Sequence, residues 1–282
     1  MVATEQKYSP GDYRSDIKPV WCPGCGDYGV FTALLNVLSQ KNYNPWDVAL
    51  ISGIGCSSRT PSFLKVYGFH TVHGRALPIA SGLKLARPDL HVMVVTGDGD
   101  GISIGGGHFI HAARRNIELV YIMMNNSIYG QTKGQASPTT RQDAITRSTP
   151  YGVFDQPLNP SSLAIVSGAT FVARGFTGNP KQLTDLMMRA INHKGFAFVE
   201  AVSPCVTFNN TLRFIKERAK DIDSTHDVTD KLKALGLAFS EEPMYFGLLY
   251  NVQMPTMNEK ISDLTAKLKG KATIDELLTS VM

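Results

Sequence analysis

The sequence lacks any long hydrophobic run. No uninterrupted apolar stretch approaches the roughly 18 residues that a membrane-spanning helix needs, and residues 1–16 lack the basic and then apolar pattern of a secretion signal. Nothing repeats at a fixed period. We therefore expect a soluble, cytoplasmic protein that does not bind membranes.

Net charge is also low. Lysine and arginine outnumber aspartate and glutamate by only four, and the basic residues are scattered rather than gathered into one strip. We therefore expect no nucleic acid as a partner. A mildly basic surface would help to dock an acidic electron carrier, although ordinary solvated lysines and arginines are the more frequent explanation.

Cysteine is scarce, with four in 282 residues, and without a secretion signal these thiols should stay reduced. Cys22 and Cys25 form a C-x₂-C pair in a turn, whereas Cys56 and Cys205 stand alone, each just after a predicted strand. Four thiolates suit zinc or an iron–sulfur cluster. The spacing favours a cluster, because a structural zinc site usually has a second close pair. Zinc and inert thiols both stay open.

Apolar runs of strand length alternate with helical patterns. The predicted strands are 48–52, 92–96, 119–124 and 196–202, and such near-continuous runs suit strands buried on both faces of a parallel sheet. Helical patterns cover 29–40, about 78–87, about 103–114 and 181–193, the last after an N-cap at Asn179 and a proline. The alternation predicts an α/β fold with a parallel sheet flanked by helices.

The remaining segments are less regular. Residues 130–160 read as a long loop, and long loops inside domains are often functional. Farther on, polar helical patterns over 214–239 and 257–280 enclose a strand-like segment, 244–252. We predict three parts: an N-terminal cluster-ligand segment (1–28), an α/β domain (29–208) and a C-terminal extension (209–282) that wraps the core or a partner.

A glycine-rich acidic turn, GDGDG, follows the strand at 92–96 directly. Its glycines let backbone N–H groups approach a phosphate, but Asp98 would repel a bare diphosphate unless Mg²⁺ bridged the two. Asn126 ends the next strand and can offer its amide oxygen to the same ion. Ligands of parallel α/β folds bind at the carboxyl ends of strands. Both turns should therefore open onto one crevice.

GDG followed by NN at this spacing resembles the diphosphate motif of thiamine-diphosphate enzymes. The resemblance implies that Asp98, Asn126 and the backbone carbonyl of Ile128 bind Mg²⁺. Gly97, Gly99 and Asp100 are then expected to contact the cofactor. The alternative is a glycine turn beside an Asx-rich loop that binds no ligand.

Five motifs in order, WCPGCG, GIGCSS, HxxHGR, GDGD and NNSIYG, resemble the β subunits of 2-oxoacid:ferredoxin oxidoreductases over most of residues 20–210. The resemblance implies the thiamine-diphosphate-binding fold with a C-terminal extension. It also implies one [4Fe–4S] cluster, close to the thiamine ring, on Cys22, Cys25, Cys56 and Cys205. The implied cofactor contacts are Ile54, Gly55, Cys56, Ser57, His73, Gly74, Arg75, Ala76, Gly130 and Gln131.

The implied reaction is the oxidative decarboxylation of a 2-oxoacid, with transfer of the acyl group to coenzyme A and of single electrons through the cluster to ferredoxin. It is reversible as a CO₂-fixing carboxylation. Two alternatives remain: a thiamine-dependent decarboxylase subunit with structural zinc, and an iron–sulfur scaffold that has lost cofactor binding.

Substrate preference depends on Arg59, three residues beyond Cys56. A guanidinium there would bind the second carboxylate of 2-oxoglutarate, and GIGCSSR is more similar to members acting on 2-oxoglutarate than to those restricted to pyruvate. The alternatives are a surface or partner-paired arginine, and a pyruvate or broad 2-oxoacid specificity. His70 and His73 form a conceivable zinc pair, but the resemblance favours His73 as a cofactor contact.

The chain has room for only the diphosphate-binding half of a thiamine site. Thiamine enzymes need a glutamate that protonates the aminopyrimidine, and neither Glu118, at a strand start, nor Glu200, within a strand, is a persuasive candidate. The resemblance therefore implies an α subunit that supplies the pyrimidine-binding domain and this glutamate, in an (αβ)₂ assembly.

Overall fold

Near-continuous apolar runs form the centre of one sheet. The computed structural model describes residues 6–267 and 273–281, and its eight strands are ordered β2-β1-β3-β4-β6-β5-β8-β7. The strands from β2 to β5 in this order run parallel, and β8 pairs antiparallel with β5. The strands are Val48–Ser52 (β1), Tyr67–His70 (β2), His91–Gly97 (β3), Leu119–Asn125 (β4), Phe171–Phe176 (β5), Phe196–Val202 (β6), Ala219–Asp221 (β7) and Met244–Asn251 (β8).

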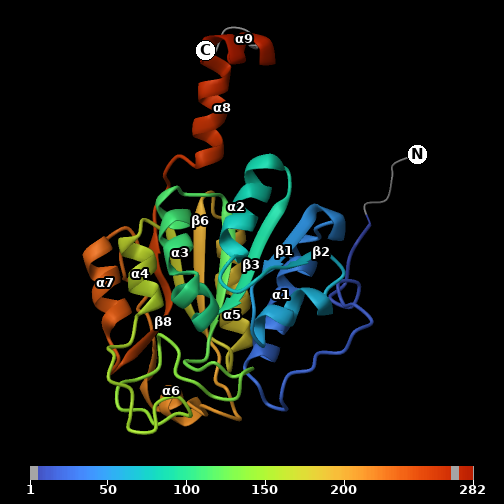
Figure 1. Ribbon diagram of the computed structural model, residues 1–282. Coiled ribbons are helices and arrows are strands. Elements are labelled where there is room, and N and C mark those ends of the chain that lie inside the picture. The colour runs from blue at the N-terminus through green and yellow to red at the C-terminus, as the bar shows by residue number, and fades with distance from the viewer. Residues whose placement is uncertain (1–5, 268–272, 282) are drawn as a thin grey trace.

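Helices cover both faces of this sheet (Figure 1). α1 and α5 pack into one hydrophobic core, and α2, α3, α4 and α7 pack into the core on the other face. Every residue of β1, β4 and β5 is buried, as expected for strands covered on two sides. The helices are Asp27–Lys41 (α1), Ala76–Ala86 (α2), Gly106–Arg114 (α3), Pro160–Val166 (α4), Pro180–Asn192 (α5), Leu212–Arg218 (α6), Lys231–Phe239 (α7), Met257–Lys267 (α8) and Ile274–Ser280 (α9).

The predicted α/β fold is confirmed. All four predicted strands form within two residues of the expected bounds, and the strand-like segment near the C-terminus is β8. α5 begins as predicted, because the Asn179 side chain accepts a hydrogen bond from the Gln182 N–H and Pro180 occupies the first turn. Two of the parallel strands, β2 and β5, escaped prediction. β2 is an edge strand whose four residues are all exposed, and Arg174 and Gly175 interrupt the apolar run of β5.

The prediction of helix over 214–239 is wrong in its middle. α6 ends at Arg218, β7 follows, and α7 begins only at Lys231, because the Asp230 side chain caps it. Between them, Asp223 and Asp227 accept hydrogen bonds from backbone N–H groups two residues ahead. Such local bonds compete with helix formation.

The last two helices, α8 and α9, stand clear of the sheet at the end opposite α6 (Figure 1). None of the residues of α8 is buried. They bear out the helical pattern at 257–280 except at 268–272, which lie outside the described residues. No helix in the described part of the chain is both long and apolar enough to cross a bilayer.

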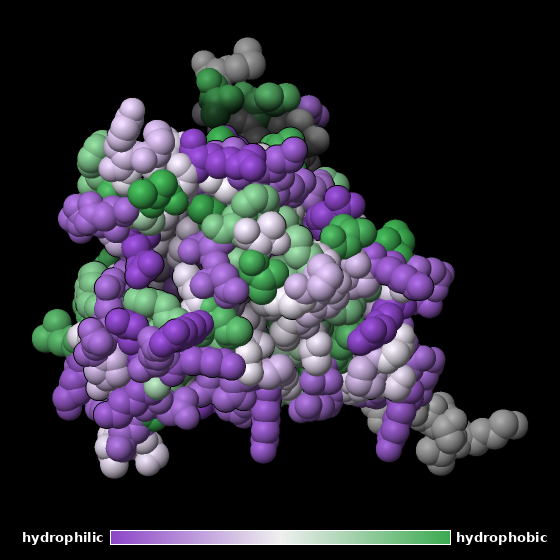
Figure 2. Space-filling view, turned by 90° about the horizontal axis from the view of Figure 1, so that it is seen from below, coloured by the Kyte–Doolittle hydropathy of each residue, from purple (hydrophilic) through white to green (hydrophobic). Residues whose placement is uncertain are grey.

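The carboxyl ends of the parallel strands meet at one edge, beside α6 and the long segment 130–160 (Figure 1). That segment forms no helix or strand before α4 begins at Pro160, as predicted. Seen from this side, the surface is mostly hydrophilic with separate hydrophobic patches (Figure 2). The motifs that follow β1, β3, β4 and β6 therefore lie together.

Candidate active site

The GDGDG motif begins at the last residue of β3, Gly97, and leads through Asp98 into a π-helical stretch, Gly99–Ile104. α3 then begins at Gly106. The helix predicted over about 103–114 therefore starts as the end of the π-helical stretch and continues as an α-helix. π-helical turns are rare and recur at functional sites. Gly99 is required here, because an added Cβ would lie 2.2 Å from the Tyr129 ring. The ring in turn donates its hydroxyl to the Gly99 carbonyl at 3.1 Å.

Asp98 is buried at the start of this turn, with 1% of its surface exposed. Its Oδ2 accepts a hydrogen bond from the Thr139 hydroxyl at 2.7 Å, and the Asn126 N–H lies 3.4 Å from its Oδ1. Burial raises the pKa of Asp98 above its ordinary value. A cation beside the carboxylate would oppose that rise and favour the charged form.

The turn after β4 has a fixed shape that presents the other two predicted ligands. Ser127 adopts a left-handed conformation, with φ at 54°, which is uncommon outside glycine. The Asn126 side chain accepts a hydrogen bond from the Ile128 N–H at 3.0 Å, and Asn209 donates to the Asn126 carbonyl at 3.0 Å. The Asn126 amide oxygen and the Ile128 carbonyl thus belong to one braced turn.

These two turns and the loop after β1 enclose a cavity of about 110 Å³. Most of the residues predicted to contact the cofactor line it. Tyr129 and Thr132 also line it and were missed, although Tyr129 is part of the NNSIYG motif. The lining residues are Ile54, Gly55, Cys56, Ser57, His73, Gly97, Asp98, Gly99, Asp100, Asn126, Ile128, Tyr129, Gly130, Gln131 and Thr132.

Three of the predicted cofactor contacts do not reach the wall of this cavity: Gly74, Arg75 and Ala76 are absent from its lining. Ala76 begins α2 and packs into the core. Gly74 adopts φ of 71° and approaches Ile104 so closely that a Cβ would lie 2.5 Å from its side chain.

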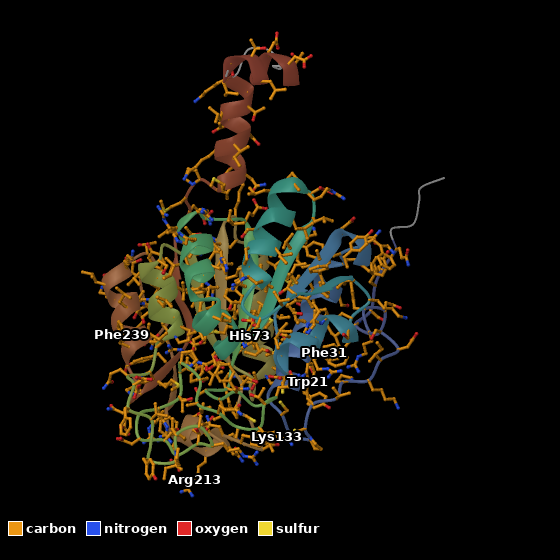
Figure 3. All side chains as sticks on the ribbon, viewed as in Figure 1. Trp21, Phe31, His73, Lys133, Arg213 and Phe239 are labelled. Atoms are coloured by element: carbon orange, nitrogen blue, oxygen red, sulfur yellow. The ribbon has the colours of Figure 1, made fainter. Side chains whose placement is uncertain are left out.

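Asp100 ties two loops of the cavity together. Its Oδ1 accepts hydrogen bonds from the N–H groups of Ile54 at 2.9 Å and of Gly74 at 2.8 Å. His73 Nδ1 lies 2.9 Å from the same oxygen (Figure 3 labels His73) but is not oriented to form a hydrogen bond. Burial raises the pKa of Asp100, and its Oδ2 is buried without a partner. Asp100 therefore shapes the cavity as well as lining it.

All four cysteines line a second cavity, of about 270 Å³. Cys22 and Cys25 precede α1, Cys56 follows β1, and Cys205 follows β6. The indole N–H of Trp21 donates to the Cys56 carbonyl at 2.7 Å, and Trp21 packs edge-on against Phe31 beside it (Figure 3).

The four thiols are free. Burial, the Asp27 carboxylate and the neighbouring cysteines raise the pKa of Cys25, and the same influences raise that of Cys56 to about 11. Thiols in this setting become thiolates only beside positive charge, such as that of bound metal.

No group of three or more His, Cys, Asp or Glu side chains within residues 6–267 and 273–281 could hold a single metal ion. His70 Nδ1 contacts the Ser52 hydroxyl and the Ser58 carbonyl, both at 2.9 Å, whereas His73 faces Asp100. The two rings therefore have separate partners, which does not support a zinc pair.

Neither candidate glutamate faces the first cavity. Glu118 precedes β4 at the opposite edge of the sheet and pairs with Lys84 at 3.1 Å. Glu200 lies 2.9 Å from Arg174, and both side chains are 4% exposed. Burial alone would raise the pKa of Glu200, but Arg174 and three hydrogen bonds hold it below its ordinary value. Both residues are occupied by structural ion pairs.

Arg59 is exposed and is one of the residues that line the cysteine cavity. No salt bridge to it is formed within the described residues. Its guanidinium is thus available to a ligand or to another chain.

Comparison with known proteins supplies the family. Residues 53–201 match the C-terminal TPP-binding domain of thiamine pyrophosphate enzymes, and residues 205–266 match the C-terminal family of the pyruvate ferredoxin oxidoreductase beta chain. The chain is 50% identical over 207 residues to the 2-oxoglutarate oxidoreductase subunit KorB of Mycobacterium tuberculosis, covering 73% of this chain and 56% of that protein. It is 39% identical over 269 residues to the 2-oxoglutarate synthase subunit KorB of Methanocaldococcus jannaschii, covering 92% and 97%.

A solved structure is similar over almost the whole chain. It is the 2-oxoglutarate:ferredoxin oxidoreductase from Magnetococcus marinus with 2-oxoglutarate, coenzyme A and succinyl-CoA bound, at a TM-score of 0.94 and 40% identity, covering 99% of this chain and 97% of that one. The chain also matches 65% of the length of the β subunit of 2-oxoacid:ferredoxin oxidoreductase 1 from Aeropyrum pernix, at 45% identity over 73% of its own length. It therefore spans a little over half to two thirds of some relatives and nearly all of others.

Proposed function

The chain belongs to the β subunits of the 2-oxoacid:ferredoxin oxidoreductases, and we propose that it carries the thiamine-diphosphate and electron-transfer half of a CoA-acylating 2-oxoglutarate:ferredoxin oxidoreductase. One observation carries the proposal. The cavity at the GDG and NN turns and the cavity of the four cysteines share the wall residues Cys56, Asn126, Gly130 and Gln131. A group bound in one would lie next to a group bound in the other.

The residues of the first cavity fit Mg²⁺ and a diphosphate. Asp98, Asn126 and the Ile128 carbonyl offer the hard oxygen ligands that Mg²⁺ prefers. Glycines flank Asp98 on both sides, and backbone N–H groups at glycines can approach a phosphate closely. The buried Asp98 carboxylate lacks a positive partner within the described residues, which a cation would supply.

The residues of the second cavity fit a [4Fe–4S] cluster better than zinc. Four ligands of one zinc ion must all lie about 2.3 Å from it, and the described cysteines form no group that could hold a single ion. The ligands of a cluster bind four different iron atoms, so they stand around a space. A cavity of about 270 Å³ that is lined by four cysteines from three chain segments supports that arrangement.

This chain's own residues position and shield the reacting groups. When bound, thiamine diphosphate stabilises the negative charge left as a 2-oxoacid loses CO₂, and the cluster accepts electrons one at a time. Ile54 to Ser57 line the first cavity, and this loop reaches the wall shared by the two sites at Cys56. Asp100 fixes this loop through the Ile54 N–H. Arg59, which is exposed and lines the cysteine cavity, is proposed to bind the second carboxylate of 2-oxoglutarate.

The proposal includes an α subunit that supplies the catalytic glutamate. No glutamate lines either cavity in the described part of this chain, and Glu118 and Glu200 are held by Lys84 and Arg174. We infer an (αβ)₂ assembly that uses ferredoxin as electron acceptor and coenzyme A as acyl acceptor. The free thiols suit the reducing interior of a cell, and we infer a cytoplasmic location.

Anaerobic co-purification with the α subunit tests this function. We expect a brown complex that contains about four iron atoms per β chain and reduces methyl viologen when given coenzyme A and 2-oxoglutarate. This chain alone should show no turnover. Zinc in place of iron, together with decarboxylation that reduces no viologen, would instead support a decarboxylase subunit. Full activity without any partner would contradict the division between subunits.

A further inference from the structure

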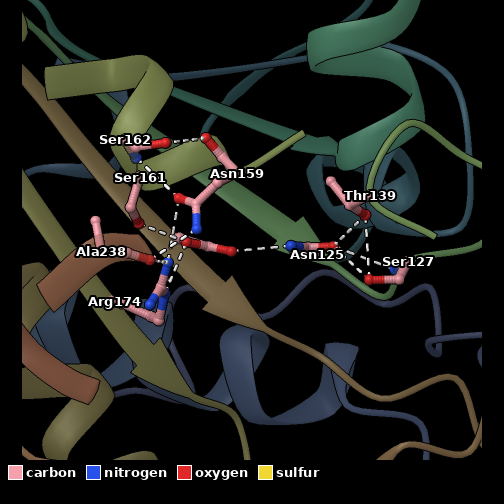
Figure 4. Close-up of polar contacts among 9 residues, drawn as sticks. Asn125, Ser127, Thr139, Asn159, Ser161, Ser162, Arg174 and Ala238 are labelled. Atoms are coloured by element: carbon pink, nitrogen blue, oxygen red, sulfur yellow. Dashed lines mark hydrogen bonds and ion pairs between the residues drawn. The ribbon is translucent and has the colours of Figure 1, made fainter. Parts of the chain in front are cut away.

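Asp98, the carboxylate proposed to bind Mg²⁺, accepts a hydrogen bond from Thr139, which is distant in the sequence and belongs to the long loop. Thr139 is 7% exposed, and its Oγ1 lies 2.7 Å from Asp98 Oδ2, 2.9 Å from Asn125 Oδ1 and 3.1 Å from Ser127 Oγ. Figure 4 shows Thr139 beside Asn125 and Ser127. Segment 130–160 is thus bonded directly to the GDG turn.

The Thr139 hydroxyl can donate only one hydrogen bond, so it must choose between two acceptors. A threonine hydroxyl carries one hydrogen, whereas Asp98 Oδ2 and Asn125 Oδ1 are both acceptors. The carboxylate is the stronger acceptor because it is charged. Asn125 Oδ1 already accepts from the N–H and hydroxyl of Ser127, at 3.2 and 3.3 Å. Thr139 therefore donates to Asp98 Oδ2, while Asp98 Oδ1 has a long contact with the Asn126 N–H. The Ser137 side chain is a further hydrogen-bond partner of this carboxylate.

The position of Thr139 is fixed from the core of the sheet. Asn125 donates from Nδ2 to Glu200 Oε1 at 2.9 Å, and the other oxygen of Glu200 accepts from Arg174 and Ser161 (Figure 4). Because an ionised glutamate only accepts, the Asn125 amide nitrogen must face Glu200, and its oxygen must face Thr139 and Ser127. The buried Arg174–Glu200 ion pair therefore orients the Asn125 amide, whose oxygen contacts the Thr139 hydroxyl.

The loop around Thr139 holds the second metal-binding turn as well. The neighbouring Thr140 donates its hydroxyl to the Ser127 carbonyl at 2.8 Å and accepts from the Ser137 N–H at 2.7 Å. Residues 137–140 thus contact the Asp98 turn through Ser137 and Thr139, and the Asn126–Ile128 turn through Thr139 and Thr140. No other part of the described loop makes hydrogen bonds to both turns.

We propose that Thr139 is a positioning residue that holds Asp98 in its cation-binding orientation and couples the loading of Mg²⁺ and thiamine diphosphate to the ordering of residues 137–140. The inference rests on the proposed function of this site. A hydrogen bond to a charged group contributes enough that its loss weakens binding roughly ten- to a hundredfold. The hydroxyl, not the shape of the side chain, carries the effect.

The test uses the αβ complex freed of cofactor, titrated with thiamine diphosphate by calorimetry at several Mg²⁺ concentrations. Thr139→Val keeps the shape and deletes the hydroxyl, and Thr139→Ser restores it. The matched control is Thr146→Val in the same loop, where the hydroxyl bonds only within the loop. We expect Thr139→Val to bind the cofactor roughly ten- to a hundredfold more weakly and to need more Mg²⁺. Thr139→Ser and Thr146→Val should stay near the wild type.

Hydrogen exchange gives a second readout, which already tests the coupling in the wild-type complex. In the wild-type complex, the amides of Ser137, Thr139 and Thr140 should gain protection when Mg²⁺ and thiamine diphosphate bind, and Thr139→Val should lose that gain. Unchanged protection in the wild type would overturn the coupling.

Equal cofactor affinity of Thr139→Val and wild type would overturn the positioning role, as would a Thr139→Ser variant as weak as Thr139→Val. A wild-type complex that binds no thiamine diphosphate with Mg²⁺ would instead overturn the proposed function and this inference with it.

Discussion

Asp100 offers a graded test of how the cofactor cavity is shaped. Its Oδ1 accepts hydrogen bonds from a partly buried N–H at Ile54 and a buried N–H at Gly74. Ile54 belongs to the loop that contains Cys56, and Gly74 belongs to the loop that contains His73. Asp100→Ala removes both bonds and leaves two polar hydrogens without a partner. Asp100→Asn keeps an oxygen that can accept from both and removes only the charge.

The expected size follows from the burial of the two donors. An unsatisfied buried donor costs about 1–3 kcal/mol. With one donor partly reached by water, we expect a total of about 2–4 kcal/mol for Asp100→Ala. With about half of this lowering the stability of the empty protein and half weakening binding, cofactor affinity should fall roughly five- to thirtyfold. The cofactor affinity of Asp100→Asn should lie between that of Asp100→Ala and that of the wild type.

Calorimetric titration of thiamine diphosphate into the αβ complex at saturating Mg²⁺ measures this order directly. The reasoning fails if Asp100→Ala binds the cofactor as tightly as the wild type. It also fails if Asp100→Asn binds the cofactor more weakly than Asp100→Ala does. The carboxylate would then act through its charge on the metal rather than through its hydrogen bonds to the two loops.

Three more predictions use different parts of the molecule. Arg59→Ala should lower the ratio of kcat/KM for 2-oxoglutarate to that for pyruvate by roughly tenfold, and an unchanged ratio would remove Arg59 from substrate binding. Gly99→Ala should weaken cofactor binding because its Cβ would lie 2.2 Å from the Tyr129 ring, whereas Gly106→Ala, with nothing within 4 Å of its Cβ, should not. Burial lowers the pKa of His193 from 6.5 to about 4, so the unfolded chain binds more protons in that window and the free energy of unfolding should fall as the pH drops through it. Denaturant melts at about pH 7 and about pH 5 measure that fall, and a His193→Gln variant with the same pH dependence would contradict the assignment.

The central strands and the phosphate turn could be predicted from the sequence because their signals are local. Runs such as 119–124 are apolar throughout, and the Asn179-Pro180 pair indicates a helix start on its own. The GDG and NN turns each follow a strand, so the rule for carboxyl ends was enough to bring Asp98 and Asn126 to one cavity.

The parts that escaped prediction depend on contacts between distant segments. β5 contains Arg174, which reads as a surface residue until its buried partner Glu200 is known. Thr139 lies in a polar loop without periodicity, and nothing in its neighbourhood indicates a bond to Asp98, 41 residues away in the sequence. The break between α6 and α7 arises from aspartate side chains that bond to the backbone, which a count of helical positions overlooks.

The role of Asp100 shows the limit of motif reading in another way. Its place in GDGD predicted a cofactor contact, and it does line the cavity. One oxygen of its carboxylate, however, is occupied by the Ile54 and Gly74 N–H groups. Gly53 makes this possible, because a Cβ there would lie 1.8 Å from Asp100 Oδ2.

The central claim is that the thiamine site and the cysteine site form one electron path through the wall that contains Cys56. The most direct test is the visible absorbance of the anaerobic αβ complex after addition of 2-oxoglutarate without ferredoxin or any other acceptor. We predict that the broad absorbance of the oxidised cluster bleaches and returns when an acceptor is added. Release of CO₂ from 2-oxoglutarate with the absorbance unchanged would contradict the account.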